Sequence, residues 1–285
     1  MAELIIIGGG PAGVSAALYA LRAGIKVLLL ENGPGALDKA HRIENYYGAA
    51  AAGTELYAAG LEQAAALGAE ILHEEVLSLD YTGNFAVQTA SASYEAPAVI
   101  LATGTKNVTL KLDGLQRLEG RGVSYCAVCD GFFYRGKNVA VLGSGAYALH
   151  EADYLRHLAG SITILTNGED GTAAKAAGFN VDDRPLQAVN GEEKISSVTF
   201  ADGTELPLDG LFIALGTAGS TDMARKLGAM LNGRFIAINA DGATNIPGLF
   251  AAGDCTGGML QVAKAVYEGA AAGSAAIKYL RSLNK

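Results

Sequence analysis

Several features that would place a protein in a special class are scarce in this sequence. No apolar run approaches the roughly 18 or more residues that span a bilayer, and the N-terminus has no basic stretch before its first apolar run. We therefore expect no membrane association, no secretory signal and a cytoplasmic location. Basic residues number 21 against 29 acidic ones, and the net charge of −8 argues against nucleic-acid binding. Three cysteines in 285 residues are too few for a disulfide-stabilised scaffold.

Glycine and apolar residues are abundant instead. The chain has 38 glycines and 50% hydrophobic residues, without a Gly-X-Y period, so the glycines should mark turns and close backbone approaches. The length predicts about two domains.

The chain contains two similar strand–helix–strand segments. Short β-branched runs predict buried parallel strands, and each is followed by glycines and an alanine-rich helix. The first segment has strands at 4–7 and 25–30 with a helix over 14–22. The second has strands at 139–142 and 162–165 with a helix from the glycines to about 159. Two further segments, 94–101 and 198–215, alternate like antiparallel strands.

The first glycine turn, residues 8–13, fits the pattern G-x-G-x-x-G. Gly8 makes the tight turn, Gly10 lets a pyrophosphate approach the backbone, and Gly13 allows the helix to pack on the strand. Pro11 suits the first turn of a helix, whose N-terminal N–H groups favour phosphate. Glu31 ends the second strand, where an acid can bond a ribose hydroxyl. The sequence therefore predicts a site for FAD or NAD.

Cys126 and Cys129 have the spacing C-x-x-C, which indicates a redox or a metal-binding pair. A structural zinc site needs four ligands. Cys255 and the four histidines show no ligand spacing to the pair, so we expect no metal. We interpret Cys255 as a small buried residue.

Four segments carry a family resemblance. Residues 248–254, a strand that runs into Gly-Asp, and Ala-Thr-Gly at 102–104 resemble the flavin-dependent pyridine nucleotide–disulfide oxidoreductases. Residues 120–134 and the loop 41–48 resemble the active-site segment and a flavin-contacting loop of the low-molecular-weight thioredoxin reductases. The resemblance implies an FAD cofactor bound by Gly8, Gly10, Pro11, Ala12, Gly13, Glu31, Asn45, Ala102, Thr103, Gly104, Gly253, Asp254 and Gln261.

The resemblance also assigns roles around the cysteine pair. A thiolate attacks a disulfide through a mixed disulfide, and a second thiol resolves it. By resemblance, Cys129 faces the flavin and Cys126 exchanges with the partner disulfide. Asp130 can donate and accept the proton of the leaving thiolate. The implied activity is that of a flavin-dependent thioredoxin-disulfide reductase.

The second glycine turn, residues 143–148, departs from the family. The strand after it should lead into a His-Arg-Arg run whose guanidiniums hold the NADPH 2′-phosphate. Residues 166–170 read Thr-Asn-Gly-Glu-Asp instead, and Tyr147 places a bulky ring in the turn. The segment 166–194 is also short, and Leu-Gln at 260–261 replaces Arg-Gln. This pattern is similar to the ferredoxin-dependent, NADPH-independent subgroup, so we expect thioredoxin and ferredoxin as partners.

Four alternatives remain open at this point. They are an atypical NAD(P)H-dependent thioredoxin reductase, a dithiol oxidase that uses oxygen, a diflavin disulfide oxidoreductase in which Tyr147 stacks on the second flavin, and a non-catalytic flavoprotein. An acidic chain steers an acidic ferredoxin poorly, so a local basic patch is required. The candidates are Arg117, Arg121, Arg135 and Lys137.

The predicted fold is α/β, with two Rossmann-like three-layer dinucleotide-binding domains, one inserted in the other. The FAD-binding domain would comprise 1–108 and 217–285, and the redox-active domain with a degenerate NAD(P)H fold would comprise 109–216. Segments 104–112 and 216–220 are the expected hinges. The resemblance implies a homodimer.

Overall fold

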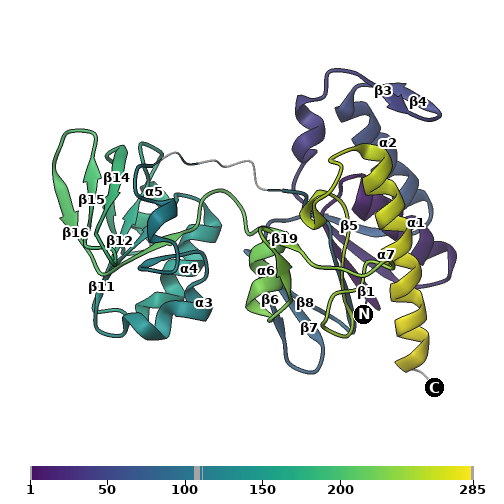
Figure 1. Cartoon of the computed structure of the whole chain (residues 1–285). Helices are drawn as coiled ribbons and strands as arrows, with labels where there is room; N and C mark the ends of the chain where they lie inside the picture. Colours follow the sequence, from purple (N-terminus) through teal and green to yellow (C-terminus); the bar gives the residue numbers. More distant parts are fainter. Residues whose placement is uncertain (1, 106–109, 111, 284–285) are drawn as a thin grey trace. The chain divides into compact units, whose positions relative to one another are not determined.

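The computed structural model describes residues 2–105, 110 and 112–283. The chain divides into two compact units, Met1–Lys106 with Gly219–Lys285 (unit 1) and Asn107–Ala218 (unit 2). Figure 1 follows both units along the sequence. Of the first expected hinge, residues 106–109 and 111 lie outside the described residues.

Unit 1 is built on a five-stranded parallel sheet with the order β20-β9-β1-β2-β5. β1 and β9 are short apolar runs in which every residue is buried, as expected of parallel strands covered on both faces. The strands are β1 (Leu4–Ile7), β2 (Val27–Glu31), β5 (Glu70–His73), β9 (Ala98–Leu101) and β20 (Leu249–Ala251). The predicted strand at 25–30 is therefore displaced toward Glu31.

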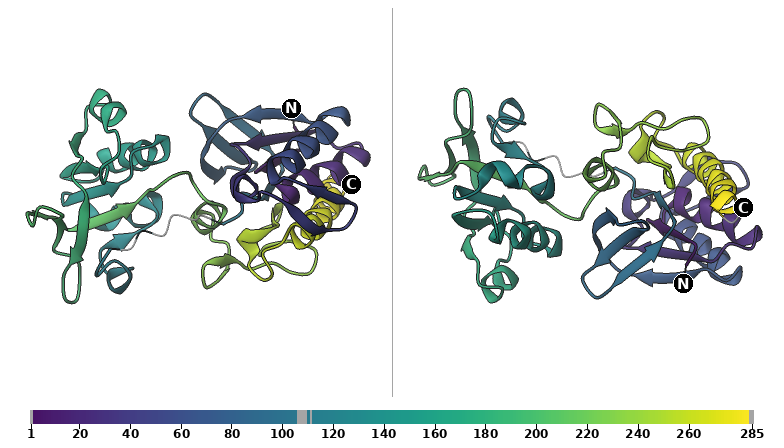
Figure 2. Two further views of the ribbon diagram at one scale, coloured as in Figure 1. Left: turned by 90° about the horizontal axis from the view of Figure 1, so that it is seen from above. Right: turned by 90° about the horizontal axis from the view of Figure 1, so that it is seen from below.

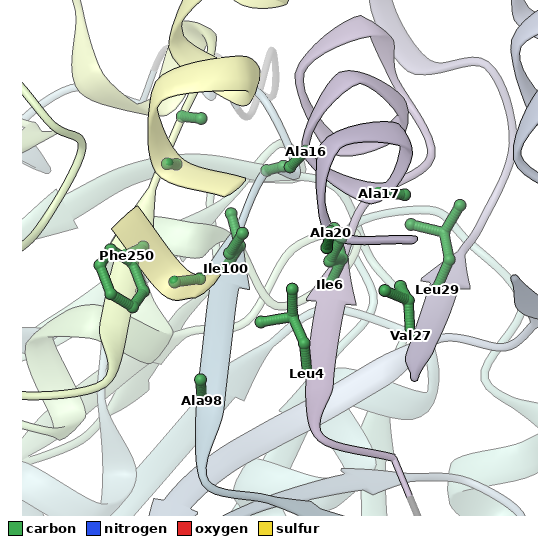
Figure 3. Packing of buried hydrophobic residues seen from close by; sticks show 14 of the residues in the cluster. Leu4, Ile6, Ala16, Ala17, Ala20, Val27, Leu29, Ala98, Ile100 and Phe250 are labelled. Atoms are coloured by element: carbon green, nitrogen blue, oxygen red, sulfur yellow. The ribbon is translucent and has the colours of Figure 1, made fainter. Parts of the chain in front are cut away.

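Two helices, α1 (Pro11–Arg22) and α7 (Val262–Leu283), lie side by side in unit 1 (Figures 1 and 2). A Cβ at Gly273 would lie 2.7 Å from Ala16 O, so the close approach of the two backbones requires a glycine there. Small residues of both helices pack against the strands in one core (Figure 3). α1 begins at Pro11, earlier than the predicted 14, because proline suits the first helical position.

Smaller elements complete unit 1. They are η1 (Gly35–Lys39), β3 (Ile43–Tyr46), β4 (Ala49–Ala51), α2 (Gly53–Ala66), β6 (Val76–Tyr81), β7 (Phe85–Thr89), β8 (Ser93–Ala96), α6 (Ser220–Lys226), β18 (Leu231–Asn232), β19 (Phe235–Ile236) and η4 (Asp254–Thr256). β6, β7 and β8 form an antiparallel sheet.

Unit 2 repeats the plan with a second parallel sheet in the order β10-β17-β11-β12-β13. Its strands are β10 (Val123–Ser124), β11 (Asn138–Leu142), β12 (Ser161–Leu165), β13 (Asn180–Asp182) and β17 (Gly210–Ile213). Helix α4 (Ala146–Arg156) follows the second glycine turn and ends before the predicted 159. The mixed α/β fold with two Rossmann-like units is as predicted.

The antiparallel interpretation of two segments is only half right. β8 is antiparallel, but β9, in the same segment 94–101, joins the parallel sheet. In the segment 198–215, β15 and β16 pair antiparallel while β17 is parallel to β11. Consecutive buried residues in β9 and β17, rather than alternation, mark strands that are covered on both faces.

The other elements of unit 2 are η2 (Gln116–Leu118), α3 (Ala127–Asp130), η3 (Gly131–Tyr134), α5 (Thr172–Ala176), β14 (Leu186–Asn190), β15 (Ser197–Phe200) and β16 (Glu205–Pro207). Among the described residues of the whole chain, no helix is long and apolar enough to cross a membrane.

Candidate functional site

The first glycine turn has the backbone that a dinucleotide requires. Gly8 has φ +114°, and a Cβ there would overlap the carbonyl of Ala102. A Cβ at Gly13 would overlap Gly8 O, so the helix could not pack this close to the strand. By contrast, no atom of the described residues lies within 4 Å of a Cβ built on Gly10. That side of the turn is open at the N-terminus of α1, where backbone N–H groups can receive a phosphate.

Glu31 is buried at the end of β2 and is held by three donors. Tyr57 Oη donates to Oε2, Gly33 N–H donates to Oε2 at 2.8 Å, and His73 Nδ1 lies 2.6 Å from Oε1. Burial opposes ionisation, but the hydrogen bonds from Tyr57, Gly33 and His73 outweigh it and lower the pKa of Glu31. Burial and the carboxylate both raise the pKa of Tyr57. Sequence analysis did not find Tyr57 or His73, since they lie 26 and 42 residues away.

The Gly-Asp segment meets the first glycine turn. A Cβ at Gly253 would lie 2.9 Å from Ala12 Cβ, so the two motifs are neighbours although they are far apart in sequence. Glu268 on α7 accepts the Gly253 N–H at 2.8 Å, and Lys264 bridges Gly253 O and Glu268. Burial raises the pKa of Asp254 against the opposing charge of Lys264. The i, i+4 spacing of Lys264 and Glu268 on a predicted helix is the sequence signal that could have indicated this ion pair, which holds the backbone of Gly253.

Two more residues that are predicted to contact the flavin, Thr103 and Asn45, have side chains held by hydrogen bonds. Thr103 Oγ1 and Ser220 Oγ are 2.7 Å apart, and the Ser220 N–H donates to Thr103 Oγ1 at 2.9 Å. Asn45 Nδ2 donates to Gln261 Oε1 at 2.8 Å, which joins the loop 41–48 to the start of α7. Ser220 was missed by sequence analysis, because only the fold brings it to Thr103.

These residues fit FAD. The open face at Gly10, the helix N-terminus, the strand-end acid and the braced Gly253–Asp254 turn all belong to unit 1. Together they offer N–H donors for a pyrophosphate and carboxylates for hydroxyl groups.

Cys126 and Cys129 form a disulfide across the start of α3. Cys126 is 2% exposed, whereas Cys129 is exposed. The Cys129 N–H donates to Cys126 Sγ at 3.1 Å. Ser124 Oγ accepts the Cys126 N–H at 3.1 Å and donates to Asp130 Oδ2 at 2.7 Å, so it connects the pair to the predicted acid. Ser124 is a site residue that the sequence did not indicate.

The sequence shortly after the cysteine pair, residues 132–137, is rich in aromatic and basic residues. Phe132 and Phe133 are exposed on η3, and the guanidinium of Arg135 lies 5.3 Å from the Phe132 ring. Lys137 lies 5.5 Å from the Tyr134 ring. Of the other basic candidates, Arg117 donates to Gly191 O at 2.6 Å. Arg135 and Lys137 thus each lie over an aromatic ring of η3, the helix that follows α3, whereas Arg117 is engaged by the loop at 191.

In the second glycine turn, residues 143–148, a hydroxyl group is hydrogen-bonded to an acid of the same unit. Ser144 Oγ, between the two glycines, donates to the Glu169 carboxylate. The loop that carries Glu169 is fixed, since Asn167 (φ +54°) accepts the Leu186 N–H at 2.7 Å. The Tyr147 side chain is 0% exposed. The expectation that this ring lies in the turn and could stack on a flavin is therefore wrong, because the side chain points into the unit.

The third cysteine, Cys255, is 1% exposed, as predicted, and burial raises the pKa of its thiol to about 12. In the described part of the chain, no group of three or more His, Cys, Asp or Glu residues could hold a metal ion.

The chain has well-defined relatives. The family model of the pyridine nucleotide-disulphide oxidoreductases matches residues 2–269. A thioredoxin reductase from Listeria innocua is 34% identical and aligns over 99% of this chain and 95% of its own length. The crystal structure of the atypical thioredoxin reductase TRi from Desulfovibrio vulgaris Hildenborough has a TM-score of 0.93, with 42% identity and 99% of both chains covered.

A crystal structure of a ferredoxin-flavin thioredoxin reductase from Clostridium acetobutylicum has a TM-score of 0.75 and 31% identity, covering 99% of this chain and 98% of that one. The family match and these identities extend over both units. The chain belongs to the pyridine nucleotide-disulphide oxidoreductase family, as a thioredoxin reductase-type disulfide oxidoreductase whose cofactor is FAD.

Proposed function

We propose that this enzyme reduces the disulfide of a thioredoxin through Cys126 and Cys129, with electrons that come from reduced ferredoxin and not from NADPH. The observation that carries the choice of donor is the second glycine turn, where Glu169 bonds Ser144 and residues 166–170, directly after β12, include no arginine. The similarity to a structure named a ferredoxin-flavin thioredoxin reductase supports the same choice.

Unit 1 is the proposed FAD-binding domain. Gly8, Gly10 and the N-terminus of α1 would receive the pyrophosphate, and Glu31 and Asp254 would accept hydrogen bonds from hydroxyl groups of the cofactor. The remaining contacts are those assigned by the resemblance, namely Pro11, Ala12, Gly13, Asn45, Ala102, Thr103, Gly104, Gly253 and Gln261. When bound, FAD supplies a carrier that accepts single electrons and delivers them in pairs.

Unit 2 carries the disulfide chemistry. Two electrons and two protons convert the Cys126–Cys129 disulfide to a dithiol. One thiolate of the pair then attacks the thioredoxin disulfide, which forms a mixed disulfide and releases a thioredoxin thiolate. The other thiol of the pair attacks the mixed disulfide, so the pair is oxidised again and thioredoxin leaves as a dithiol. Asp130, connected to the pair by Ser124, moves the proton.

The different exposure of the two cysteine residues restricts the order of events. Cys129 is exposed and Cys126 is buried while the disulfide is closed. Exchange of Cys126 with thioredoxin, the role assigned by resemblance, therefore requires that reduction first frees the segment that covers it. Phe132, Phe133 and Arg135 would contact the partner beside Cys129.

The proposed electron flow is downhill. A plant-type ferredoxin has a potential near about −400 mV and thioredoxin near about −270 mV. Two electrons that cross about 130 mV release on the order of 6 kcal/mol. Two reduced ferredoxins therefore suffice for each disulfide, and no nicotinamide is needed. By resemblance, the enzyme acts as a homodimer.

An anaerobic titration of the flavin absorbance tests this proposal. Reduced ferredoxin, NADPH and NADH would be added separately to the purified yellow protein. We expect rapid bleaching with ferredoxin only, followed by reduction of thioredoxin. Rapid bleaching with NADPH or NADH would overturn the assignment of the donor. Bleaching only by a small dithiol, with reoxidation by air, would favour a dithiol oxidase instead.

A further inference from the structure

A buried carboxylate lies next to the redox disulfide and has no role in the chemistry described so far. Glu151 is on α4, the helix that follows the second glycine turn, and is 2% exposed. Its Oε2 accepts the backbone N–H of Ala127 at 2.7 Å, and this hydrogen bond is buried. A buried acid is costly unless it is hydrogen-bonded, so its place here calls for a reason beyond packing.

The contact falls at the point where the disulfide is anchored. Cys126 precedes α3, and Ala127 is the first residue of that helix. Cys126 Sγ accepts the Cys129 N–H at 3.1 Å across the same turn. The carboxylate of Glu151 therefore binds the residue next to Cys126, from a helix 24 residues further along the chain.

We propose that Glu151 is a positioning residue that sets the reduction potential of the Cys126–Cys129 pair. It holds α3 in place and makes the dithiol a stronger reductant. The proposal rests on the proposed function in one respect, that this pair is the group that is reduced and oxidised in turnover.

The direction of the effect follows from charge. Reduction breaks the S–S bond, takes up two electrons and two protons, and yields two thiols, one of which can ionise to a thiolate. The disulfide is neutral, whereas the reduced pair can carry a negative charge. A carboxylate in a poorly solvated position beside Cys126 disfavours that charge and so favours the disulfide. A pair that favours its disulfide passes electrons more readily to thioredoxin.

Two other acidic residues near this site, Asp130 and Asp153, differ from Glu151 in burial and in hydrogen-bond partners. Asp130 is half-buried and bonded to Ser124, and Asp153, on the same helix as Glu151, is exposed and pairs with Arg156 at 3.2 Å. Asp153 offers a matched control, because its substitution removes the same charge from an exposed position on the same helix.

Equilibration of the holoenzyme with dithiothreitol buffers tests the proposal without thioredoxin or ferredoxin. After an acid quench and maleimide labelling, mass spectrometry counts the reduced cysteines. At pH 9, above the ordinary thiol pKa of about 8.5, we expect Glu151→Gln to shift the equilibrium toward the dithiol by up to about tenfold, the limit for a one-unit fall in a thiol pKa. Asp153→Asn should leave it within about twofold, as for an exposed charge. An unchanged equilibrium in Glu151→Gln, or an equal shift in Asp153→Asn, would overturn the proposal.

A second variant covers the case in which Glu151→Gln does not fold. Glu151→Asp keeps the charge but withdraws it by one methylene, so the equilibrium should shift in the same direction by a smaller factor, about two- to threefold. No shift in a folded Glu151→Asp would contradict the role of the carboxylate. Because this equilibrium does not depend on the electron donor, its failure is distinct from a failure of the ferredoxin assignment.

Discussion

The two glycine turns share a backbone and differ in what faces it. Gly10 and Gly145 precede their helices with nearly the same angles, φ −72° and ψ −178° in unit 1, and φ −84° and ψ −178° in unit 2. At the position between the first two glycines, unit 1 has Gly9, where a Cβ would lie 2.7 Å from Glu31 Cβ. Unit 2 has Ser144, whose hydroxyl bonds Glu169.

The two units also differ in how they use the acid at or shortly after the end of the second strand, Glu31 in unit 1 and Glu169 in unit 2. The hydrogen-bond partners of Glu31, namely Tyr57, Gly33 and His73, all lie outside the first glycine turn, so no side chain of the turn is engaged by this acid. Glu169 is held by the turn itself. Under the proposed function, unit 2 keeps the strands and the tight turn of a Rossmann-like unit but not the side chains that recognise a dinucleotide. The fold alone does not indicate a cofactor, and the side chains around the turn do.

The largest effect is expected from the pair that gives unit 2 its chemistry. Cys129→Ser leaves one thiol and no disulfide, so thioredoxin reduction should fall by at least about a thousandfold. The flavin absorbance should stay, because the proposed FAD site lies in unit 1. The measurement is a steady-state assay beside an absorbance spectrum, and Cys255→Ser is the control, since that thiol is buried away from solvent. Retained turnover would move the chemistry to another group.

A matched pair of glycine substitutions tests the comparison directly. Gly10→Ala should fold, because its Cβ meets no described atom within 4 Å, but the Cβ would occupy space that the pyrophosphate needs. We expect the Kd for FAD to rise by about ten- to a hundredfold. Gly145→Ala should leave it unchanged. Equal losses in both variants, measured by fluorescence titration of the apoprotein, would mean that the substitutions act on folding.

Removal of the acid that closes the second turn should have a smaller effect. Glu169→Ala takes away a negative charge and frees Ser144. The affinity for 2′,5′-ADP, measured by calorimetry, should rise about two- to fivefold, since an exposed charge contributes up to about 1 kcal/mol. Binding should stay weak without arginines. The control is Glu193→Ala in an exposed loop, and tight binding to the unaltered protein would refute the interpretation of this turn.

The last prediction concerns stability rather than binding or turnover, and it tests the donors to Glu31. Tyr57→Phe removes one hydrogen bond to a buried carboxylate and should lower the free energy of unfolding by about 1–2 kcal/mol at pH 7. The folded state lowers the pKa of Glu31, so this stabilisation is present above the ordinary pKa of about 4.3 and is lost as the pH falls through the folded value.

Urea denaturation at pH 7 and near pH 4 checks this sign. The difference between the unaltered protein and Tyr57→Phe should shrink at the lower pH. Tyr94→Phe is a matched control, because the Tyr94 hydroxyl also donates to a glutamate, Glu74, at 3.1 Å but outside the dinucleotide turn. A difference that grows on acidification would show that Tyr57 stabilises the protonated form of Glu31.

Local chemistry explains which parts of the fold the sequence could predict. Gly13 is required by a close contact with the backbone of Gly8 in the same turn, and β1 is an uninterrupted apolar run, so both were predictable. The orientation of β9 and β17 was not, because it depends on which strands they join. Alternation is a property of one strand, whereas parallel pairing is a property of the sheet.

The site was predictable to the same extent. The cysteine pair and the Gly-Asp segment are continuous motifs with fixed chemistry. The residues that hold them, such as Tyr57, His73, Ser220 and Glu151, reach the site from elements that are distant in sequence. Tyr147 shows the opposite failure, since its place in the motif suggested exposure and its helix turns it inward.

The hydrogen bonds between Thr103 and Ser220 have a consequence for how such an enzyme arises. These residues lie just before and just after the inserted unit, 117 positions apart, yet their side chains are 2.7 Å apart. A gene segment spliced between them extends a loop of unit 1 and interrupts neither its sheet nor its core. We therefore expect unit 1 to fold with a different unit, or a short loop, inserted at this point.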